Sequence, residues 1–236
     1  MKTGDNITTQ RGNWQFDKNV SKNFVNHISR SVPGYIEGHN IVCDLSDFFL
    51  YKNSICYEIG SSTAELTKKL HQHNKHKKNI NYIGIETESS MISIAKKHCS
   101  NLKNINFTKS DVRNFKFKKT PMIISYYSIQ FIPPRDRQDL INKIYESLEW
   151  GGAFIWFEKV RGSDARFQDI LVNRYNNFKL QNGFTHEEIF NKSESLKGIL
   201  EPFSTDGNFG LLKRAGFEDS MVVYKNICFE GILSIK

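Results

Sequence analysis

Acidic and hydroxyl side chains follow a short apolar run near residue 57, in a pattern that suits a nucleotide-type ligand. The stretch ICYEIGSSTAEL (residues 55–66) places Glu58 and Gly60 at the end of that run. Ser61 and Ser62 come directly after it. Glycine at this point allows the chain to turn sharply and a ligand to approach the backbone closely. We therefore predict a ligand site that begins at this turn.

Each of the next three apolar runs also ends in residues that could contact an adenosyl group. They are Glu86 and Thr87, Asp111 and Val112, and Tyr126 and Tyr127. Glu86 can accept hydrogen bonds from both ribose hydroxyls, while Asp111 and the amide of Val112 can bind adenine. Acids at Glu58, Glu86 and Asp111 disfavour a pyrophosphate and tolerate a positively charged sulfonium. The pattern therefore favours S-adenosylmethionine as the cofactor over a dinucleotide.

The glycines of a dinucleotide site are missing from this stretch. Such sites use G-x-G-x-x-G so that the pyrophosphate can approach the backbone. Here Ser62 and Ala64 would crowd a pyrophosphate, whereas an amino-acid tail could meet the hydroxyls. The alternative is that Gly60 is only a strand-to-helix turn and Glu86 only a helix cap. Acids after two successive strands, together with Gly60, favour the ligand site.

The order of elements predicts an α/β fold with a doubly wound, Rossmann-like sheet of seven strands. Five short strands alternate with helices, at 54–59, 80–85, 105–108, 122–125 and 153–157. Two later apolar runs, at 221–224 and 227–233, predict an antiparallel hairpin as the last pair. Helices are expected before the first strand, at 16–28 and 35–50. In such sheets the ligand lies at the carboxyl ends of the strands, where the candidate residues fall.

The chain is expected to form one domain. Residues 1–14 are polar and predict a disordered tail, and residues 15–236 predict the domain itself, with a helical insertion at about 161–203 after the fifth strand. The N-terminus has no apolar segment typical of a signal peptide, and four separate cysteines suit a reducing compartment. We therefore expect a cytoplasmic protein without a membrane span.

The formal net charge of +8 comes from lysines that are spread along the whole chain. Such a distribution favours a general compositional bias, and we do not expect direct nucleic-acid binding. His71, His73 and His76 lie among lysines with no acid or cysteine beside them, so we predict a solvated loop and no metal site. Arginines in the insertion could meet an anionic small-molecule substrate or form structural ion pairs.

Longer motifs in the chain resemble the carboxy-S-adenosylmethionine synthase family, within the superfamily of class I S-adenosylmethionine-dependent methyltransferases. The resemblance covers residues 16–236, and SRSVPGY, which ends at Tyr35, is its most specific part. The other matching stretches are YEIGSSTAELT, IGIETESSMI, SDVRNF, SIQFIPPRDRQDLINKIYESL, GGAFIWFEK, NNFKLQNGFTHEEI and LLKRAGFEDS.

The resemblance implies a cofactor site, a reaction and an assembly. The cofactor residues that it carries over are Tyr35, Gly60, Ser61, Ser62, Glu86, Thr87, Asp111 and Val112. The family converts S-adenosylmethionine and prephenate into carboxy-S-adenosylmethionine, which feeds a wobble-uridine modification of tRNA. The helical insertion in this family forms a dimer, so the resemblance implies a homodimer.

Two positions depart from the family pattern. Tyr126 stands where the family has an asparagine at the end of strand four. Ser193 stands where the family has an arginine that pairs with the new carboxylate across the dimer, and Lys192 lies beside it. Serine cannot replace the bidentate arginine fork, and a lysine is a point charge. This change argues against the carboxylated product.

Three functions remain open from the sequence. The departure at Ser193 favours an S-adenosylmethionine-dependent methyltransferase acting on a small molecule. The second hypothesis is carboxy-S-adenosylmethionine synthase with an altered carboxylate clamp, and the third is a binding module without activity. In an enzyme, Tyr126 and Tyr127 would shape the pocket or hydrogen-bond the acceptor, although both could equally be core tyrosines.

Overall fold

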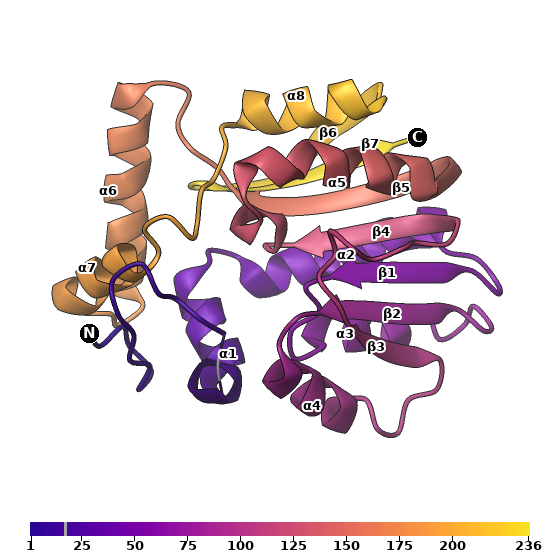
Figure 1. Cartoon of the computed structure of the whole chain (residues 1–236), viewed down its shortest axis with the longest axis horizontal. Coiled ribbons are helices and arrows are strands. Elements are labelled where there is room, and N and C mark those ends of the chain that lie inside the picture. Colours follow the sequence, from indigo (N-terminus) through magenta and orange to yellow (C-terminus); the bar gives the residue numbers. More distant parts are fainter. Residues whose placement is uncertain (17) are drawn as a thin grey trace.

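The computed structural model describes residues 1–16 and 18–236, which form one seven-stranded sheet (Figure 1). The strand order is β3-β2-β1-β4-β5-β7-β6. The strands are β1 (Ile55–Ile59), β2 (Asn81–Glu86), β3 (Ile105–Lys109), β4 (Thr120–Tyr126), β5 (Leu148–Lys159), β6 (Asp219–Asn226) and β7 (Phe229–Ile235). Strands β1 to β5 pair in parallel, whereas β7 runs antiparallel to β5 and β6. The predicted doubly wound fold with an antiparallel last pair is confirmed.

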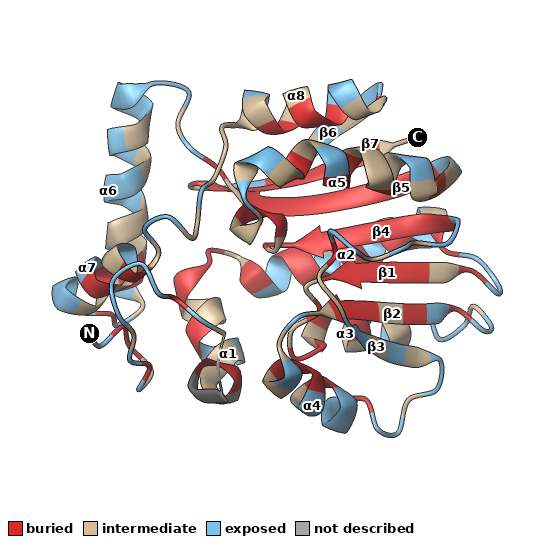
Figure 2. Ribbon diagram, viewed as in Figure 1, coloured by how far each residue is buried: buried red, intermediate tan, exposed pale blue. Residues whose placement is uncertain are grey.

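Apolar sequence places β4 at the centre of the sheet. All seven of its residues, TPMIISY, are buried, as expected for a parallel strand that is covered on both faces. The edge strand β3 has no fully buried residue and alternates half-buried with exposed side chains for most of its length. Figure 2 shows the same contrast between the central and edge strands. The hydrophobic core therefore lies on both sides of β1, β4 and β5.

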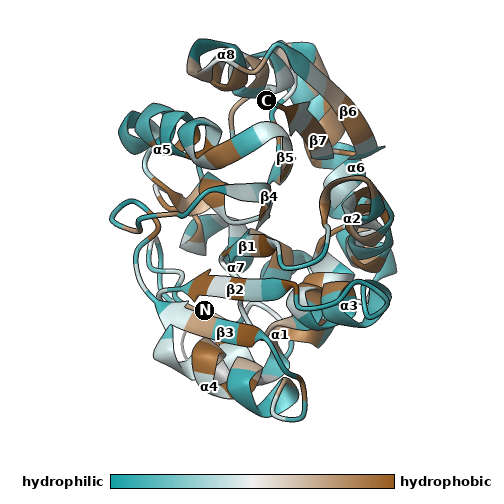
Figure 3. Ribbon diagram, turned by 90° about the vertical axis from the view of Figure 1, so that its right-hand side faces the viewer, coloured by the Kyte–Doolittle hydropathy of each residue, from teal (hydrophilic) through white to brown (hydrophobic). Residues whose placement is uncertain are grey.

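Helices cover the two faces of the sheet (Figure 3). They are α1 (Lys18–Ser31), α2 (Tyr35–Phe49), α3 (Glu65–His73), α4 (Ser89–His98), α5 (Pro134–Ser147), α6 (Ala165–Gln181), α7 (His186–Ser195) and α8 (Thr205–Ala215), with a short 3₁₀ helix at Ile129–Phe131. Val42 and Leu70 anchor α2 and α3 in one core cluster, and Ile141 and Leu212 anchor α5 and α8 in another. Within the described residues, no helix is long and apolar enough to cross a membrane.

The insertion after β5 forms α6 and α7, which lie beyond the carboxyl ends of the strands (Figure 1). Local signals define both helices. Asp164 accepts a hydrogen bond from the Phe167 amide, and Thr185 and Glu188 form a reciprocal capping box at α7. Most of α6 is exposed or half-buried, as Figure 2 shows. The insertion thus forms a wall that faces the ends of the strands.

The N-terminal segment packs against this wall, in place of the disordered tail expected for residues 1–14. Ile7 and Trp14 are buried. The Gly12 amide donates to the Glu194 carbonyl at the end of α7. Two apolar residues in a polar segment are too sparse a signal to reveal such packing from sequence.

Asp5 links the N-terminal segment to α1 through an ion pair and a hydrogen bond. The Asp5 carboxylate accepts hydrogen bonds from Arg30 Nη1 at 2.6 Å and from His27 Nδ1 at 2.8 Å. Burial lowers the pKa of His27 to about 4, so the imidazole is neutral and donates its Nδ1 proton to Asp5. The N-terminal segment is therefore part of the folded domain.

Candidate functional site

One cavity of about 910 Å³ lies between the carboxyl ends of the strands and the helical insertion. Its walls contain every residue predicted from the sequence to bind or act on a ligand. These residues are Tyr35, Glu58, Gly60, Ser61, Ser62, Glu86, Thr87, Asp111, Val112, Tyr126 and Tyr127. The structure thus brings together side chains that are up to 92 positions apart in the chain. Their individual roles stay predictions, which the geometry refines.

The turn after β1 has an unusual backbone. Gly60, Ser62 and Ala64 all adopt the left-handed region, with φ of 69°, 49° and 68°. A Cβ at Gly60 would overlap Ser128 Oγ, so glycine is required for this path. Left-handed residues other than glycine cost energy and concentrate at functional sites. The turn is therefore built for a purpose beyond linking β1 to α3.

Two hydroxyl groups in this turn are buried without a partner. Neither Ser61 Oγ nor Thr63 Oγ1 has a hydrogen-bond partner among the described residues. Buried polar atoms in native proteins are normally paired. Both residues line the cavity, but neither hydroxyl is exposed to it, so a ligand would pair with them only after a shift of the turn.

The carboxylate of Glu86 already has structural partners. It accepts hydrogen bonds from the amides of Ser62 at 2.9 Å, Thr87 at 2.8 Å and Glu88 at 3.1 Å. None of these amides lies within α4, so Glu86 joins the loop before that helix to the turn after β1 and does not cap the helix. The Thr87 hydroxyl donates to the same carboxylate at 3.4 Å, so three of the four bonds fall on Oε1 and one falls on Oε2. Since each carboxylate oxygen has about two acceptor positions, Oε2 is the atom that can still accept a ribose hydroxyl.

Asp111 is held by an arginine that the sequence analysis missed. Arg113 Nη2 lies 2.6 Å from Asp111 Oδ2, and Arg113 Nη1 lies 2.6 Å from Asp136 Oδ2. The hydrogen bonds from Arg113 lower the pKa of Asp111, so this carboxylate is ionised at neutral pH. An arginine two residues after an acid gives no recognisable signal in sequence. The pair fixes Asp111 at the rim of the cavity.

Glu58 is a buried acid with an altered proton affinity. The residue is 6% exposed, and its carboxylate accepts a hydrogen bond from Thr67 of α3. Burial raises the pKa of Glu58 to about 8, because the charged form loses its solvation. Glu58 is therefore mostly protonated at neutral pH while the cavity holds no cation.

The two tyrosines at the end of β4 differ in their contacts. The Tyr126 hydroxyl donates to the Tyr35 carbonyl at 2.5 Å, which links β4 to α2. Tyr127 has a φ of 58°, and its buried hydroxyl has no hydrogen-bond partner among the described residues. Tyr126 therefore has a structural role as well as a place in the wall. Tyr127 lines the same wall, but its hydroxyl is buried and is not exposed to the cavity.

Gln130, a residue of the cavity wall, connects the ends of β4 and β5. Its Nε2 donates to the Tyr127 carbonyl at 3.2 Å, and its Oε1 accepts from the Lys159 amide at 2.9 Å. The Gln130 backbone also binds Glu158 and Arg137, which are both buried. The sequence analysis missed this residue, because a glutamine in a short helix has no periodic signal. Gln130 sets the positions of two wall residues at once.

Basic side chains line the part of the cavity nearest the insertion. Lys159 of β5, Lys179 of α6 and Lys192 of α7 all belong to this wall, and so does Ser193. Burial lowers the pKa of all three lysines, to about 8 for Lys179. The cavity thus has acids at the ends of β1 to β3 and amines on the opposite side.

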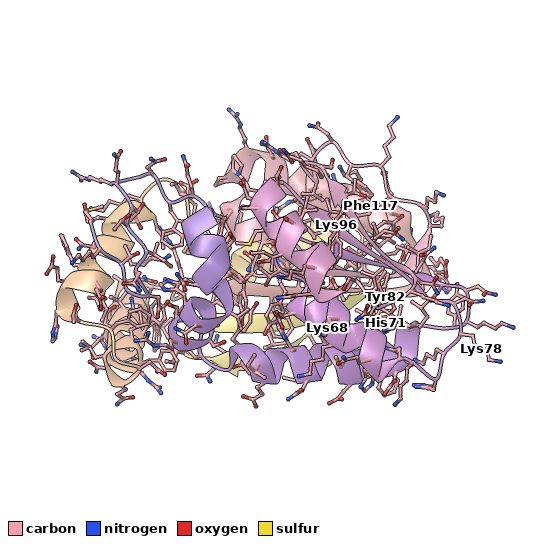
Figure 4. The ribbon with its side chains drawn as sticks, turned by 90° about the horizontal axis from the view of Figure 1, so that it is seen from below. Lys68, His71, Lys78, Tyr82, Lys96 and Phe117 are labelled. Carbon is pink, nitrogen blue, oxygen red and sulfur yellow. The ribbon has the colours of Figure 1, made fainter. Side chains whose placement is uncertain are left out.

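The histidines of the 71–76 region lie away from this site. His71 and His73 belong to α3, which extends further than the loop expected from the sequence. His71 packs against the Tyr82 ring, with centroids 5.7 Å apart, as Figure 4 shows, and His73 pairs with Asp47. Among residues 1–16 and 18–236, no group of three or more His, Cys, Asp or Glu side chains is arranged to hold a metal ion.

Comparisons with known proteins find related sequences. The methyltransferase-domain family matches residues 57–152. A carboxy-S-adenosyl-L-methionine synthase of Staphylococcus epidermidis is 39% identical, over 94% of this chain and 97% of the relative. The enzyme of the same name from Campylobacter lari is 31% identical, over 94% of each chain.

Solved structures show the same fold. A putative S-adenosyl-L-methionine-dependent methyltransferase of Methanococcus maripaludis superposes with a TM-score of 0.61, over 97% of this chain and 98% of that one. A putative O-methyltransferase of Nostoc punctiforme gives 0.65, over 93% and 59%. Their identities of 17% and 13% support the fold alone.

We expect Gln130→Leu to loosen the site and lower stability. The change leaves the Tyr127 carbonyl and the Lys159 amide without partners, which should lower the free energy of unfolding by about 2 kcal/mol. Chemical denaturation measures this loss, and calorimetry with S-adenosylhomocysteine should show affinity about tenfold weaker. Gln72→Leu, at an exposed position of α3, is the matched control. Equal behaviour of the two variants would contradict the positioning role.

Proposed function

The chain belongs to the carboxy-S-adenosyl-L-methionine synthase family, and we propose that it makes carboxy-S-adenosylmethionine from S-adenosylmethionine and prephenate. The single observation that carries the proposal is a cavity with acids on one side and amines on the other. This division suits a cationic sulfonium beside an anionic co-substrate. The proposal takes up the second of the three hypotheses drawn from the sequence, because the relatives bear this name over nearly their whole length.

The acidic side would hold the adenosyl group. Glu86 would accept the ribose hydroxyls, and Asp111 with the Val112 amide would bind adenine. Tyr35 and the turn at Ser61 and Ser62 would hold the methionine end. When bound, the sulfonium supplies a methyl group whose hydrogens are more acidic than those of an ordinary thioether. The left-handed turn at residues 60–64 then allows close approach of the ligand to the backbone.

The reaction replaces one hydrogen of that methyl group by a carboxylate. The ring carboxylate of prephenate leaves as CO₂ and its ring hydroxyl leaves as water with the proton of the methyl C–H bond, so the ring becomes aromatic and phenylpyruvate remains. The methyl carbon then forms a C–C bond to the CO₂, so the positive sulfonium acquires a negative neighbour. The family resemblance implies an arginine for this carboxylate, and this chain has Ser193 in its place. Lys192 lies beside Ser193 in the same wall, as do Lys159 and Lys179. These amines support the proposal in spite of the missing arginine.

Methyl transfer to a small molecule is the second candidate. Ser193 favours it, because the arginine that the family pattern places at this position is absent. Both candidates use the same adenosyl side and differ only in what the basic side binds.

We also propose that two copies associate through the insertion. Phe167 and Ile170 of α6 and Phe190 of α7 are about half exposed or more, which is unusual for large apolar side chains grouped in one insertion. Sedimentation equilibrium should give twice the chain mass, and Phe167→Ser with Phe190→Ser should shift it towards the monomer. A monomeric wild-type protein at micromolar concentration would contradict the proposal.

Incubation of the purified protein with S-adenosylmethionine and prephenate should yield carboxy-S-adenosylmethionine. Mass spectrometry detects the product, which is heavier than S-adenosylmethionine by the mass of one carboxyl group minus that of one hydrogen. Omission of prephenate should abolish it. A protein that binds S-adenosylmethionine but makes no such product, and methylates a small acceptor, would establish the second candidate.

The altered pKa of Glu58 predicts a pH-dependent preference for the sulfonium. Below about pH 8 the carboxyl is neutral and gives a cation little attraction, whereas above it the carboxylate is charged. S-adenosylhomocysteine has an uncharged sulfur and serves as the reference ligand. The ratio of the affinity for S-adenosylmethionine to that for S-adenosylhomocysteine should therefore rise by up to ~10-fold between about pH 6.5 and about pH 9. Calorimetry at several pH values measures both ligands. In Glu58→Gln the ratio should stay flat, and a wild-type ratio that is flat would contradict this role.

A further inference from the structure

The buried side chain of α6 is a lysine. Within α6, all of whose residues the structure describes, Lys179 is the one buried residue, with 8% of its surface exposed. Figure 2 shows how much of the rest of this helix lies at the surface. Lysine is almost never buried without a partner. A helix that buries an amine in place of an apolar residue indicates a task for that amine.

Two more amines share the same part of the cavity. Lys159 Nζ lies 4.6 Å and Lys179 Nζ 4.2 Å from the centroid of the Tyr175 ring, so the two lie close together. Lys192 Nζ lies over the ring of Trp14. The three lysines come from β5, α6 and α7. The fold therefore gathers them from three separate elements.

No carboxylate of the described residues pairs with any of these amines. The ion pairs found in residues 1–16 and 18–236 leave all three without an acidic partner within 4.0 Å. Their charges also repel one another, since Lys159 lowers the pKa of Lys179 and Lys179 lowers that of Lys192. The aromatic faces of Tyr175 and Trp14 offset only part of this cost. Unpaired, clustered amines cost stability that a bound anion would restore.

The acids in the cavity wall act elsewhere. Glu58, Glu86 and Asp111 lie at the ends of β1 to β3 and have the partners described above. Glu65, also in the wall, pairs with His98 at 3.2 Å. Burial lowers the pKa of Arg137, and the negative charge of Glu201 opposes this shift, so Glu201 acts on that guanidinium. A bound anionic ligand would therefore give the lysines the partner that the described wall residues do not supply.

Aromatic rings connect the two sides of the cavity. Tyr127 packs on Phe229 with centroids 5.5 Å apart, and Phe229 packs on Tyr175 at 5.3 Å. Tyr127, Tyr175 and Phe229 all line the cavity. A carbon ring bound between the sulfonium and the amines would thus lie against aromatic faces.

We propose that Lys159, Lys179 and Lys192 form the subsite for a dianionic co-substrate that carries two carboxylates on a carbon ring, in place of the missing arginine fork. The inference rests on the proposed function and assigns its anion-binding residues. The three lysine amines are point charges on separate elements, and they suit two separated carboxylates better than the planar fork of one arginine does. Arg161, in the same wall, is not required, because the three amines already outnumber the two charges.

The direct test is binding of prephenate to the full-length protein saturated with S-adenosylhomocysteine, which cannot react. Calorimetry should show Lys179→Met binding prephenate at least ~10-fold more weakly than wild type, because one charge-assisted contact is lost. Lys179→Arg keeps the charge and should retain most of the affinity. Lys213→Met, at an exposed position of α8, is the matched control and should bind as wild type does. Affinity for S-adenosylhomocysteine should remain within about twofold in every variant, which shows that each one is folded.

The test separates this inference from the proposed function. Equal prephenate affinity and equal product formation in wild type and Lys179→Met would overturn the lysine subsite and leave the synthase intact. If wild type makes no carboxy-S-adenosylmethionine, phenylsuccinate serves as an unreactive probe. Phenylsuccinate binding that depends on Lys179 would then support the subsite although the synthase had failed. Phenylsuccinate binding that ignores Lys179 would overturn the subsite as well.

Discussion

The electrostatic division of one buried cavity is the constraint on which the rest of the structure depends. Acids at the ends of β1, β2 and β3 face amines from β5, α6 and α7 across the same space. In a low-dielectric interior the two groups would neutralise each other if they met. The sheet fixes the acids and the insertion fixes the amines, so they remain apart. A cation and an anion can then bind side by side, each next to charges of the opposite sign.

Several polar networks keep this arrangement in place. Gln130 joins the ends of β4 and β5, and Arg113 holds Asp111 at the rim. On the far side, the N-terminal segment bonds to the end of α7 and reaches α1 through Asp5. Each network links elements that are distant in the chain. The cavity is therefore a property of the whole domain, and the insertion alone would not form it.

The residues at the carboxyl ends of the strands could be predicted from the sequence, because the patterns that indicate them are local in the chain. Strand patterns, the turn at Gly60 and the acids after successive strands lie within a few residues of one another, and the cavity contains all of these residues. The lysine cluster was not predictable, because Lys159 and Lys192 are ordinary surface residues by pattern and meet only through tertiary packing. The N-terminal segment escaped for the same reason, since its contacts reach Glu194. Ser193 in place of the arginine pointed to methyl transfer, because Lys192 beside it is a single point charge and its proximity to Lys159 and Lys179 depends on tertiary packing.

The most direct measurement of the central claim is mass spectrometry of the small molecule that co-purifies with the protein and is released by denaturation. A cavity that binds a sulfonium near the three amines should retain a ligand that carries both a positive sulfonium and a negative carboxylate. We predict that the released material contains carboxy-S-adenosylmethionine. S-adenosylmethionine or S-adenosylhomocysteine alone, from cells that make prephenate, would contradict it.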